Sequence, residues 1–241
     1  MRLIQIPFSH NCVKVRLALE RKGIPHELVD IRPIDRRPVL RASGQLGVPV
    51  LVDGDRVVVG STACALFVEE RHPDPPLVPA DPAARGECLL LEDWADRAFM
   101  EVSRRIAFWN VLRTPGLLGR LFFPGASGAG TAVKAAVARR LVARRFGLGE
   151  RRYRRDVVEA RELARLAVAR LGSRRYLVGE ALTLADLALA AMSAPLARDP
   201  ALSREPEVAA LLAWGEPIIG PALAASYRSD LPRRVAVAAA G

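Results

Sequence analysis

The amino-acid sequence predicts a small α/β domain followed by an all-α helical domain. Two observations lead to this prediction. Short apolar segments with the spacing of strands alternate with helical segments in the first part of the chain, whereas only helical patterns follow the Pro-rich stretch HPDPPLVPADP. The 241 residues are enough for both domains to bury a core. We therefore expect domains at residues 1–76 and 83–227, and a C-terminal tail at residues 228–241.

The first domain begins with a predicted β-α-β unit. An apolar strand at residues 3–6 ends at Pro7, because proline removes a backbone donor and fixes its own φ. A helix with one buried face follows at residues 11–22, and Gly23 ends it. Residues 26–31 predict a second strand. The connection between the strands is long enough for them to be parallel.

A β-hairpin and a helix complete the predicted domain. After a short helix near residues 38–42, strands at residues 49–52 and 56–59 flank the turn Asp53-Gly54-Asp55, in which glycine tolerates the positive φ of a tight turn. Ser61 or Thr62 then caps a helix that extends to about His72.

The second domain is expected to be entirely helical. Thr183 and Asp186 have the spacing of a capping box, a structural feature that stabilises a helix by about 1 kcal/mol. Pro and Gly residues interrupt the helical pattern in residues 113–131. The expected helices lie at residues 83–112, 132–146, 151–171, 184–194 and 206–214.

Composition excludes several classes of protein. The longest apolar runs are far shorter than the ~20 residues that cross a bilayer, so no membrane span is expected. The N-terminus lacks the apolar core and cleavage site of a secretory signal, which indicates a cytoplasmic protein. The three cysteines are an odd number at wide spacings, and there are only three histidines, so we expect neither a disulfide framework nor a metal site.

The formal net charge of +10 raises the question of nucleic-acid binding. Only three of the 36 basic residues are lysines, and the densest arginine cluster, at residues 139–155, contains few aromatic residues that could stack on bases. We interpret this basic segment as a solvated or interface helix face and do not expect nucleic acid as a partner.

Four segments together resemble the cytosolic glutathione transferase superfamily, and in particular a bacterial member of its serine-type classes. They are SHNCVKVRLALERKGI, GQLGVPVLVDGD, VVVGSTACALFVEERHP and YLVGEALTLADLALAAM, in the order and spacing typical of that family. The resemblance implies a thioredoxin-like N-terminal domain, an all-α C-terminal domain and glutathione as co-substrate, without a metal. It also implies a homodimer.

The same resemblance implies roles for individual residues. Ser9 would stabilise the glutathione thiolate, and its position at a helix N-terminus independently favours an anion. The backbone of Val48, before a cis Pro49, would pair with the tripeptide. Ser61 and Thr62 would bind its γ-glutamyl carboxylate. An alternative interpretation is that Ser9 is only a helix cap and Pro49 only an ordinary proline at a strand start.

Two neighbours of Ser9 are alternative sites of chemistry. Cys12 lies in the first turn of the helix, where a thiol can have a lowered pKa, but it corresponds to the position that is usually buried, and we interpret it as a packing residue. His10 could be a general base, although we predict that it faces solvent in the turn. Gly60 departs from the family, which usually has Glu or Gln there to anchor glutathione.

The predicted function is transfer of the glutathione thiolate to a small electrophilic molecule. Alternatives are a glutathione-dependent isomerase, an ether- or halide-cleaving enzyme, or a non-catalytic binding protein with the same fold. Possible residues of the second-substrate site recur on the first helix after the linker, although their spacing does not separate cleft from core. They are Trp94, Glu101, Arg105 and Phe108.

Overall fold

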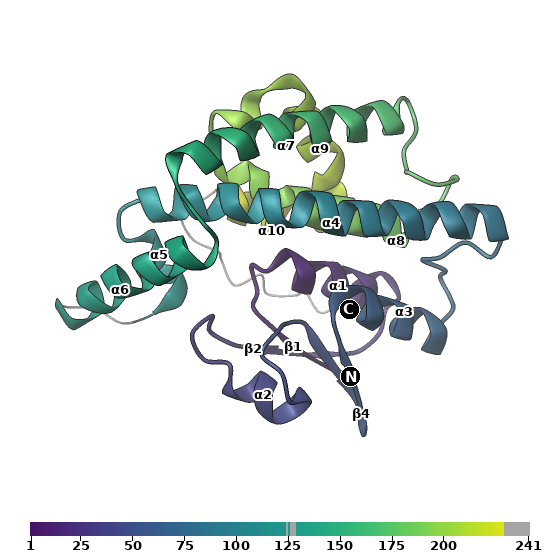
Figure 1. Ribbon diagram of the computed structural model, residues 1–241. Coiled ribbons are helices and arrows are strands. Elements are labelled where there is room, and N and C mark those ends of the chain that lie inside the picture. Colours follow the sequence, from purple (N-terminus) through teal and green to yellow (C-terminus); the bar gives the residue numbers. More distant parts are fainter. Residues whose placement is uncertain (124, 126–128, 229–241) are drawn as a thin grey trace.

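The computed structural model describes residues 1–123, 125 and 129–228. These residues form a four-stranded mixed sheet with its own helices, on which a larger set of helices is packed (Figure 1). The prediction of a thioredoxin-like α/β domain followed by an all-α domain is confirmed.

The sheet has the strand order β2-β1-β3-β4. Its strands are β1 (Arg2–Gln5), β2 (Glu27–Asp30), β3 (Val50–Asp53) and β4 (Arg56–Val59). As predicted from the β-α-β unit, β1 and β2 are parallel; β3 is antiparallel to both β1 and β4. Leu3 of β1 is opposite Leu51 of β3, and both side chains are completely buried.

Helix α1 (His10–Arg21) is buried on two sides, which fixes the position of its N-terminus. Val15 and Leu19 belong to the core under the sheet, whereas Val13 and Leu17 belong to the core of the helical domain. Figure 1 shows α1 between the sheet and the long helix α4 (Pro82–Arg113), while α2 (Arg37–Ser43) lies at the opposite side of the sheet.

The helical domain is organised around α4 and α8. The side chain of Asp81 caps α4, since its carboxylate accepts a hydrogen bond from the N–H of Ala84 at 2.8 Å. Every residue of α8 (Leu184–Ser193) is buried, because other helices and α1 cover it. Further elements are α3 (Ser61–Arg71) of the first domain, and α7 (Glu150–Leu171), α9 (Pro206–Ile219), and 3₁₀ turns at Ala194–Arg198 and Leu202–Arg204.

Three helical regions differ from the prediction. Helix α5 (Leu117–Phe122) lies in the stretch that was expected to be interrupted; it begins after Gly116, whose φ of 71° suits glycine. Its apolar side chains pack on α6 (Ala129–Arg145). Helix α9 continues beyond Trp214, and α10 (Pro221–Arg228) follows it. Most of the predicted tail, residues 229–241, lies outside the described residues.

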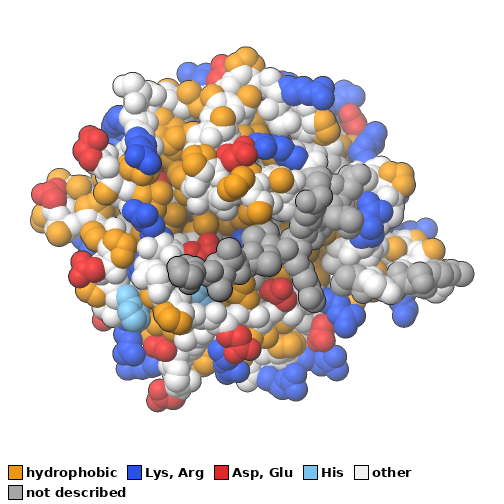
Figure 2. All heavy atoms as spheres, turned by 180° about the vertical axis from the view of Figure 1, so that it is seen from behind, with side chains coloured by type: hydrophobic (Ala, Val, Ile, Leu, Met, Phe, Trp, Pro, Cys, Tyr) orange, Lys and Arg blue, Asp and Glu red, His pale blue; other side chains and the backbone are white. Residues whose placement is uncertain are grey.

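Within the described ranges, no helix combines the length and apolar character needed to cross a membrane. On the face in Figure 2, basic side chains are spread widely, with acidic side chains among them. The arginines of the basic segment, from Arg139 to Arg155, lie on α6 and α7 and are exposed.

Candidate active site at the start of helix α1

Ser9 lies at the junction between β1 and α1. Its N–H donates a hydrogen bond to the carbonyl of Ile6 at 2.9 Å, and its own carbonyl accepts one from the N–H of Val13 at 2.8 Å. Ser9 therefore occupies the N-cap position, but its side chain makes no capping hydrogen bond. The hydroxyl of this half-buried residue thus accepts no hydrogen bond from the unpaired backbone N–H groups at the start of the helix.

Cys12 is completely buried in the first turn of α1. Burial raises the pKa of its thiol to about 11, although hydrogen bonds with the Ile6 backbone and Ser9 and the charges of Arg16 and Arg36 act in the opposite direction. The thiol is therefore protonated at neutral pH. A protonated thiol is a poor nucleophile, which supports the interpretation of Cys12 as a packing residue.

His10 is buried, and the prediction that it faces solvent is wrong. It is 6% exposed, and its Nε2 atom has no hydrogen-bond partner in the described part of the chain. Burial, together with the charges of Arg104 and Lys14, lowers its pKa to about 3. The imidazole is therefore neutral at pH 7. The sequence did not indicate that α4, which carries Arg104, covers this end of α1.

The Val48–Pro49 peptide bond is cis, as the family resemblance predicted. The register of β3 with β1 begins at the next residue, where Val50 is opposite Ile4. Val48 therefore precedes the strand pairing and is half-buried.

Positive charge surrounds the start of α1. The first turn of the helix contains no acidic residue. Arg16 is 6% exposed, and Arg36, in the loop before α2, has a buried Nη1 atom without a hydrogen-bond partner among the described residues. Both charges favour the ionised form of a thiol at Cys12. Together with the helix dipole, they make this site favourable for an anion such as a thiolate.

A buried ionic cluster connects α1, α3 and α4 and was missed from the sequence. The ammonium group of Lys14, which is completely buried, lies 2.5 Å from a carboxylate oxygen of Glu92 and 2.6 Å from one of Asp96. It also donates a hydrogen bond to the Thr62 hydroxyl at 3.2 Å. No sequence pattern relates Lys14 to partners 78 and 82 positions away.

The same cluster engages the hydroxyls predicted to bind glutathione. Thr62 donates to Glu92 at 2.7 Å, and Ser61 donates to Asp96 at 3.4 Å. The other carboxylate oxygen of Asp96, Oδ1, is buried and has no hydrogen-bond partner in the described ranges. The preceding Gly60 has a φ of 93° and contributes no side chain. The start of α3 therefore faces two carboxylates and one ammonium group.

The structure separates the four candidates on α4. Arg105 is buried and makes hydrogen bonds with Asp156 of α7, the shortest being 2.8 Å, so its guanidinium group joins two helices. Glu101 is ion-paired with Arg105 at 3.3 Å. Trp94 packs edge-on against Phe99 in the core of the helical domain. These three residues have structural partners.

Phe108 lies in a different environment. It stacks on Phe146 with ring centroids 5.0 Å apart, and it belongs to the apolar cluster that includes Phe8. Because Phe8 immediately precedes Ser9, this cluster continues toward the start of α1. In the parts of the chain that are described, no group of three or more His, Cys, Asp or Glu side chains could hold a metal ion.

Comparison with protein families gives a match over the first domain. Residues 3–76 match the family described as glutathione S-transferase, N-terminal domain. Among curated proteins, a stringent starvation protein A homolog of Haemophilus ducreyi is 36% identical over 93 residues, which are 36% of this chain and 42% of that protein. A glutathione S-transferase of Triticum aestivum is 36% identical over 73 residues, covering 30% and 34% of the two chains.

These matches thus span less than half the length of the curated relatives. The solved structures cover nearly the whole chain. A glutathione S-transferase from Rhodospirillum rubrum aligns with a TM-score of 0.65 and 23% identity over 91% of this chain and 90% of that one. A beta-etherase from Sphingobium aligns with a TM-score of 0.67 and 20% identity over 90% and 96%.

A third structure contains a ligand. A glutathione S-transferase from Methylobacterium radiotolerans, in complex with glutathione sulfonate, aligns with a TM-score of 0.52 and 26% identity over 88% of this chain and 93% of that one.

Proposed function

Because the chain belongs, by its N-terminal domain and its overall fold, to the cytosolic glutathione transferase superfamily, we propose that it transfers the thiolate of glutathione to a small electrophilic molecule. The observation that carries this proposal is the Ser9 hydroxyl, which lies at the N-terminus of α1 without capping the helix. A hydroxyl in this position can donate its hydrogen bond to a bound sulfur anion.

The proposed chemistry needs no metal and no nucleophile from the protein. The thiol of glutathione loses its proton to solvent, and the Ser9 hydroxyl, the helix dipole and the nearby arginines stabilise the thiolate. The sulfur then attacks an electrophilic carbon. A carbon–sulfur bond forms while the leaving group departs with its bonding electrons, or the product takes up a proton when the reaction is an addition.

The proposed binding of the tripeptide uses the rest of the site. The backbone of Val48 pairs with the extended peptide, and the N-terminus of α3 at Ser61 and Thr62 receives the γ-glutamyl carboxylate. The unpartnered Oδ1 atom of Asp96 is suited to accept a hydrogen bond from the ammonium group of the γ-glutamyl residue of glutathione. This contact would replace the hydrogen bond that Glu or Gln usually makes at this position in the family and that Gly60 cannot make.

The second substrate is proposed to contact the apolar cluster around Phe8 and Phe108, which continues toward Ser9. The aromatic surface favours an electrophile with an apolar body. We also propose that the protein acts in the cytoplasm as a homodimer. Sedimentation velocity would test the dimer: a species with the mass of a single chain at micromolar concentration contradicts it.

The function is tested by comparing two single-site variants. Glutathione binding is measured by calorimetry, and conjugation is measured with an activated aryl chloride. Ser9→Ala is expected to lower kcat/KM by about ten- to a hundredfold, since a hydrogen bond to a charged group contributes about 1.5–3 kcal/mol. Cys12→Ala and the surface control Ser173→Ala should retain activity. Unchanged activity of Ser9→Ala with loss of activity in Cys12→Ala would reverse the assignment.

A second candidate function is a non-catalytic binding protein. The observation that favours it is the Lys14 cluster, in which the Ser61 and Thr62 hydroxyls already have protein partners. The matching stringent starvation protein A homolog is consistent with a role outside the transferases. Absence of glutathione binding by the folded wild-type protein would favour this candidate.

A third possibility concerns the reaction rather than the site. In an isomerase, the same thiolate adds to the substrate and is expelled when the product forms; in an ether- or halide-cleaving enzyme, it displaces a phenolate or a halide from carbon. The beta-etherase with the similar fold motivates an assay with an aryl ether. Release of the phenol from this ether, without formation of a glutathione conjugate from the activated aryl chloride, would favour this reaction class.

A further inference from the structure

A cavity lies between the two domains at the end of α1 that is remote from Ser9. It has a volume of about 540 Å³, within the usual range of small-molecule sites. Leu17, Glu20 and Arg21 of α1 form one side. Because a helix rises about 1.5 Å per residue, these residues are roughly 12–18 Å from Ser9 along the helix. The cavity is therefore distinct from the proposed thiol site.

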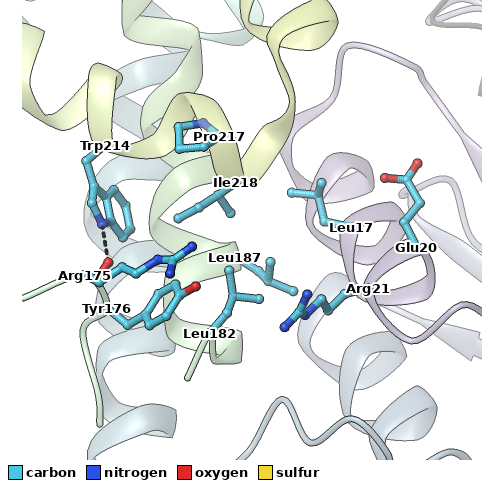
Figure 3. A pocket seen from close by; sticks show the side chains of 10 residues that line it. All are labelled: Leu17, Glu20, Arg21, Arg175, Tyr176, Leu182, Leu187, Trp214, Pro217 and Ile218. Carbon is cyan, nitrogen blue, oxygen red and sulfur yellow. Dashed lines mark hydrogen bonds between the residues drawn. The ribbon is translucent and has the colours of Figure 1, made fainter. Parts of the chain in front are cut away.

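The interior of this cavity is mainly apolar. The helical domain contributes Leu182 before α8, Leu187 within α8, and Trp214, Pro217 and Ile218 of α9. The indole N–H of Trp214 donates a hydrogen bond to the carbonyl of Arg175 at 2.9 Å, so its polar atom is already satisfied (Figure 3). The surface offered to a ligand consequently favours a hydrocarbon or aromatic body.

The charges at the cavity are unbalanced. Figure 3 shows the guanidinium groups of Arg21 and Arg175 directed toward the apolar side chains, from opposite domains. Neither forms an ion pair with an acidic group of the described residues; Arg175 lies over the ring of Tyr176, 5.2 Å from its centroid. Glu20 is the single carboxylate of the lining, and its charge is already paired with Arg16 at 3.4 Å.

Two unpaired guanidinium groups beside an apolar interior define the chemistry of a ligand. Guanidinium binds carboxylates through paired hydrogen bonds, more strongly than neutral acceptors. We propose that the cavity binds a small apolar carboxylic acid as its anion, with the carboxylate at Arg21 and Arg175 and the apolar body against Leu187 and Trp214. Such a ligand joins the α/β domain to the helical domain.

The test compares 4-phenylbutyrate with its neutral analogue 4-phenylbutan-1-ol by calorimetry on the full chain. The carboxylate is expected to bind at least about tenfold more tightly than the alcohol, which corresponds to one charge-assisted interaction. Arg21→Ala and Arg175→Ala should each weaken binding of phenylbutyrate about tenfold. The control Arg85→Ala changes an exposed arginine on α4 that also lacks an ion pair among the described residues, and it should bind like the wild type.

Two further measurements separate this site from the thiol site and from unfolding. Ser9→Ala should bind phenylbutyrate with the wild-type affinity, and circular dichroism should show that the arginine variants are folded. Equal affinities for the acid and the alcohol, wild-type affinity of both arginine variants, or no binding of phenylbutyrate would each overturn the proposal. If the protein does not conjugate glutathione, the phenylbutyrate measurements still test this proposal, because the two sites share no residue.

Discussion

Helices α1 and α8 both have a hydroxyl residue at the N-cap position, but only the hydroxyl at α8 is used at the helix end. At the start of α8, the carboxylate of Asp186 accepts hydrogen bonds from both the N–H and the hydroxyl of Thr183 at 2.8 Å, and the capping box is complete. At the start of α1, the Ser9 hydroxyl makes no capping hydrogen bond. A hydroxyl at a helix start is therefore a candidate for chemistry when the helix does not use it.

Loss of the Asp186 carboxylate at the start of α8 should destabilise the protein most. Asp186 is completely buried and also accepts a hydrogen bond from the N–H of Leu177 at 2.7 Å. Asp186→Ala leaves buried donors without acceptors and should lower the free energy of unfolding by about 3 kcal/mol. Urea denaturation measures this loss. The control Asp81→Ala, at the exposed cap of α4, should cost only about 1 kcal/mol. Equal losses would show that the buried carboxylate of Asp186 stabilises the protein no more than an exposed cap does.

We expect the free energy of unfolding to depend on pH through His10, at the start of α1. Its pKa is about 3 in the folded chain and about 6.5 in an unfolded one, so the unfolded state binds more protons between these values. The free energy of unfolding therefore falls as the pH decreases through this window, by at most about 1.4 kcal/mol per pH unit for one group. His10→Gln should make the fall shallower between pH 6 and 5.

Equilibrium unfolding at several pH values measures this slope, with His72→Gln, which changes an exposed histidine, as the matched control. An identical slope in wild type and His10→Gln would show that His10 is not buried in its neutral form.

The smallest expected effect compares the two hydroxyls directly. Thr183→Ala should lower the free energy of unfolding by about 1 kcal/mol, because a capping interaction is lost, whereas Ser9→Ala should change it by less than about 0.5 kcal/mol. Both variants are measured in the same urea titration. A loss at Ser9 as large as that at Thr183 would support the interpretation of Ser9 as an ordinary helix cap.

Local features of the fold were predictable from the sequence, because neighbouring residues determine them. The hairpin around Gly54, the β-α-β unit and the capping box at Thr183 each depend on residues a few positions apart. Helix α5 was missed for the same reason: Gly116 indicates an interruption locally, and only the packing of α5 on α6 explains why a helix forms after it.

The site was predictable only in part. Ser9 and Pro49 belong to motifs with recognisable order, and the cis peptide bond before Pro49 is confirmed. The partners of Lys14 and the burial of His10 depend on α4, which packs across the start of α1 from a distant part of the sequence. A polar residue on a helix gives no local sign that another domain covers it, so this part of the site required the three-dimensional structure.

The role of Ser9 is tested most directly by the pKa of the thiol of glutathione when it is bound to the protein. Ultraviolet absorbance of the thiolate, recorded against pH, gives this value for the wild type and for Ser9→Ala. We predict that the thiol bound to the wild type ionises at least about one pH unit below a free thiol, whose pKa is about 8.5, and that Ser9→Ala raises the value by about one unit. Equal values in the two proteins, or a bound thiol that ionises like free glutathione, would contradict the role of Ser9.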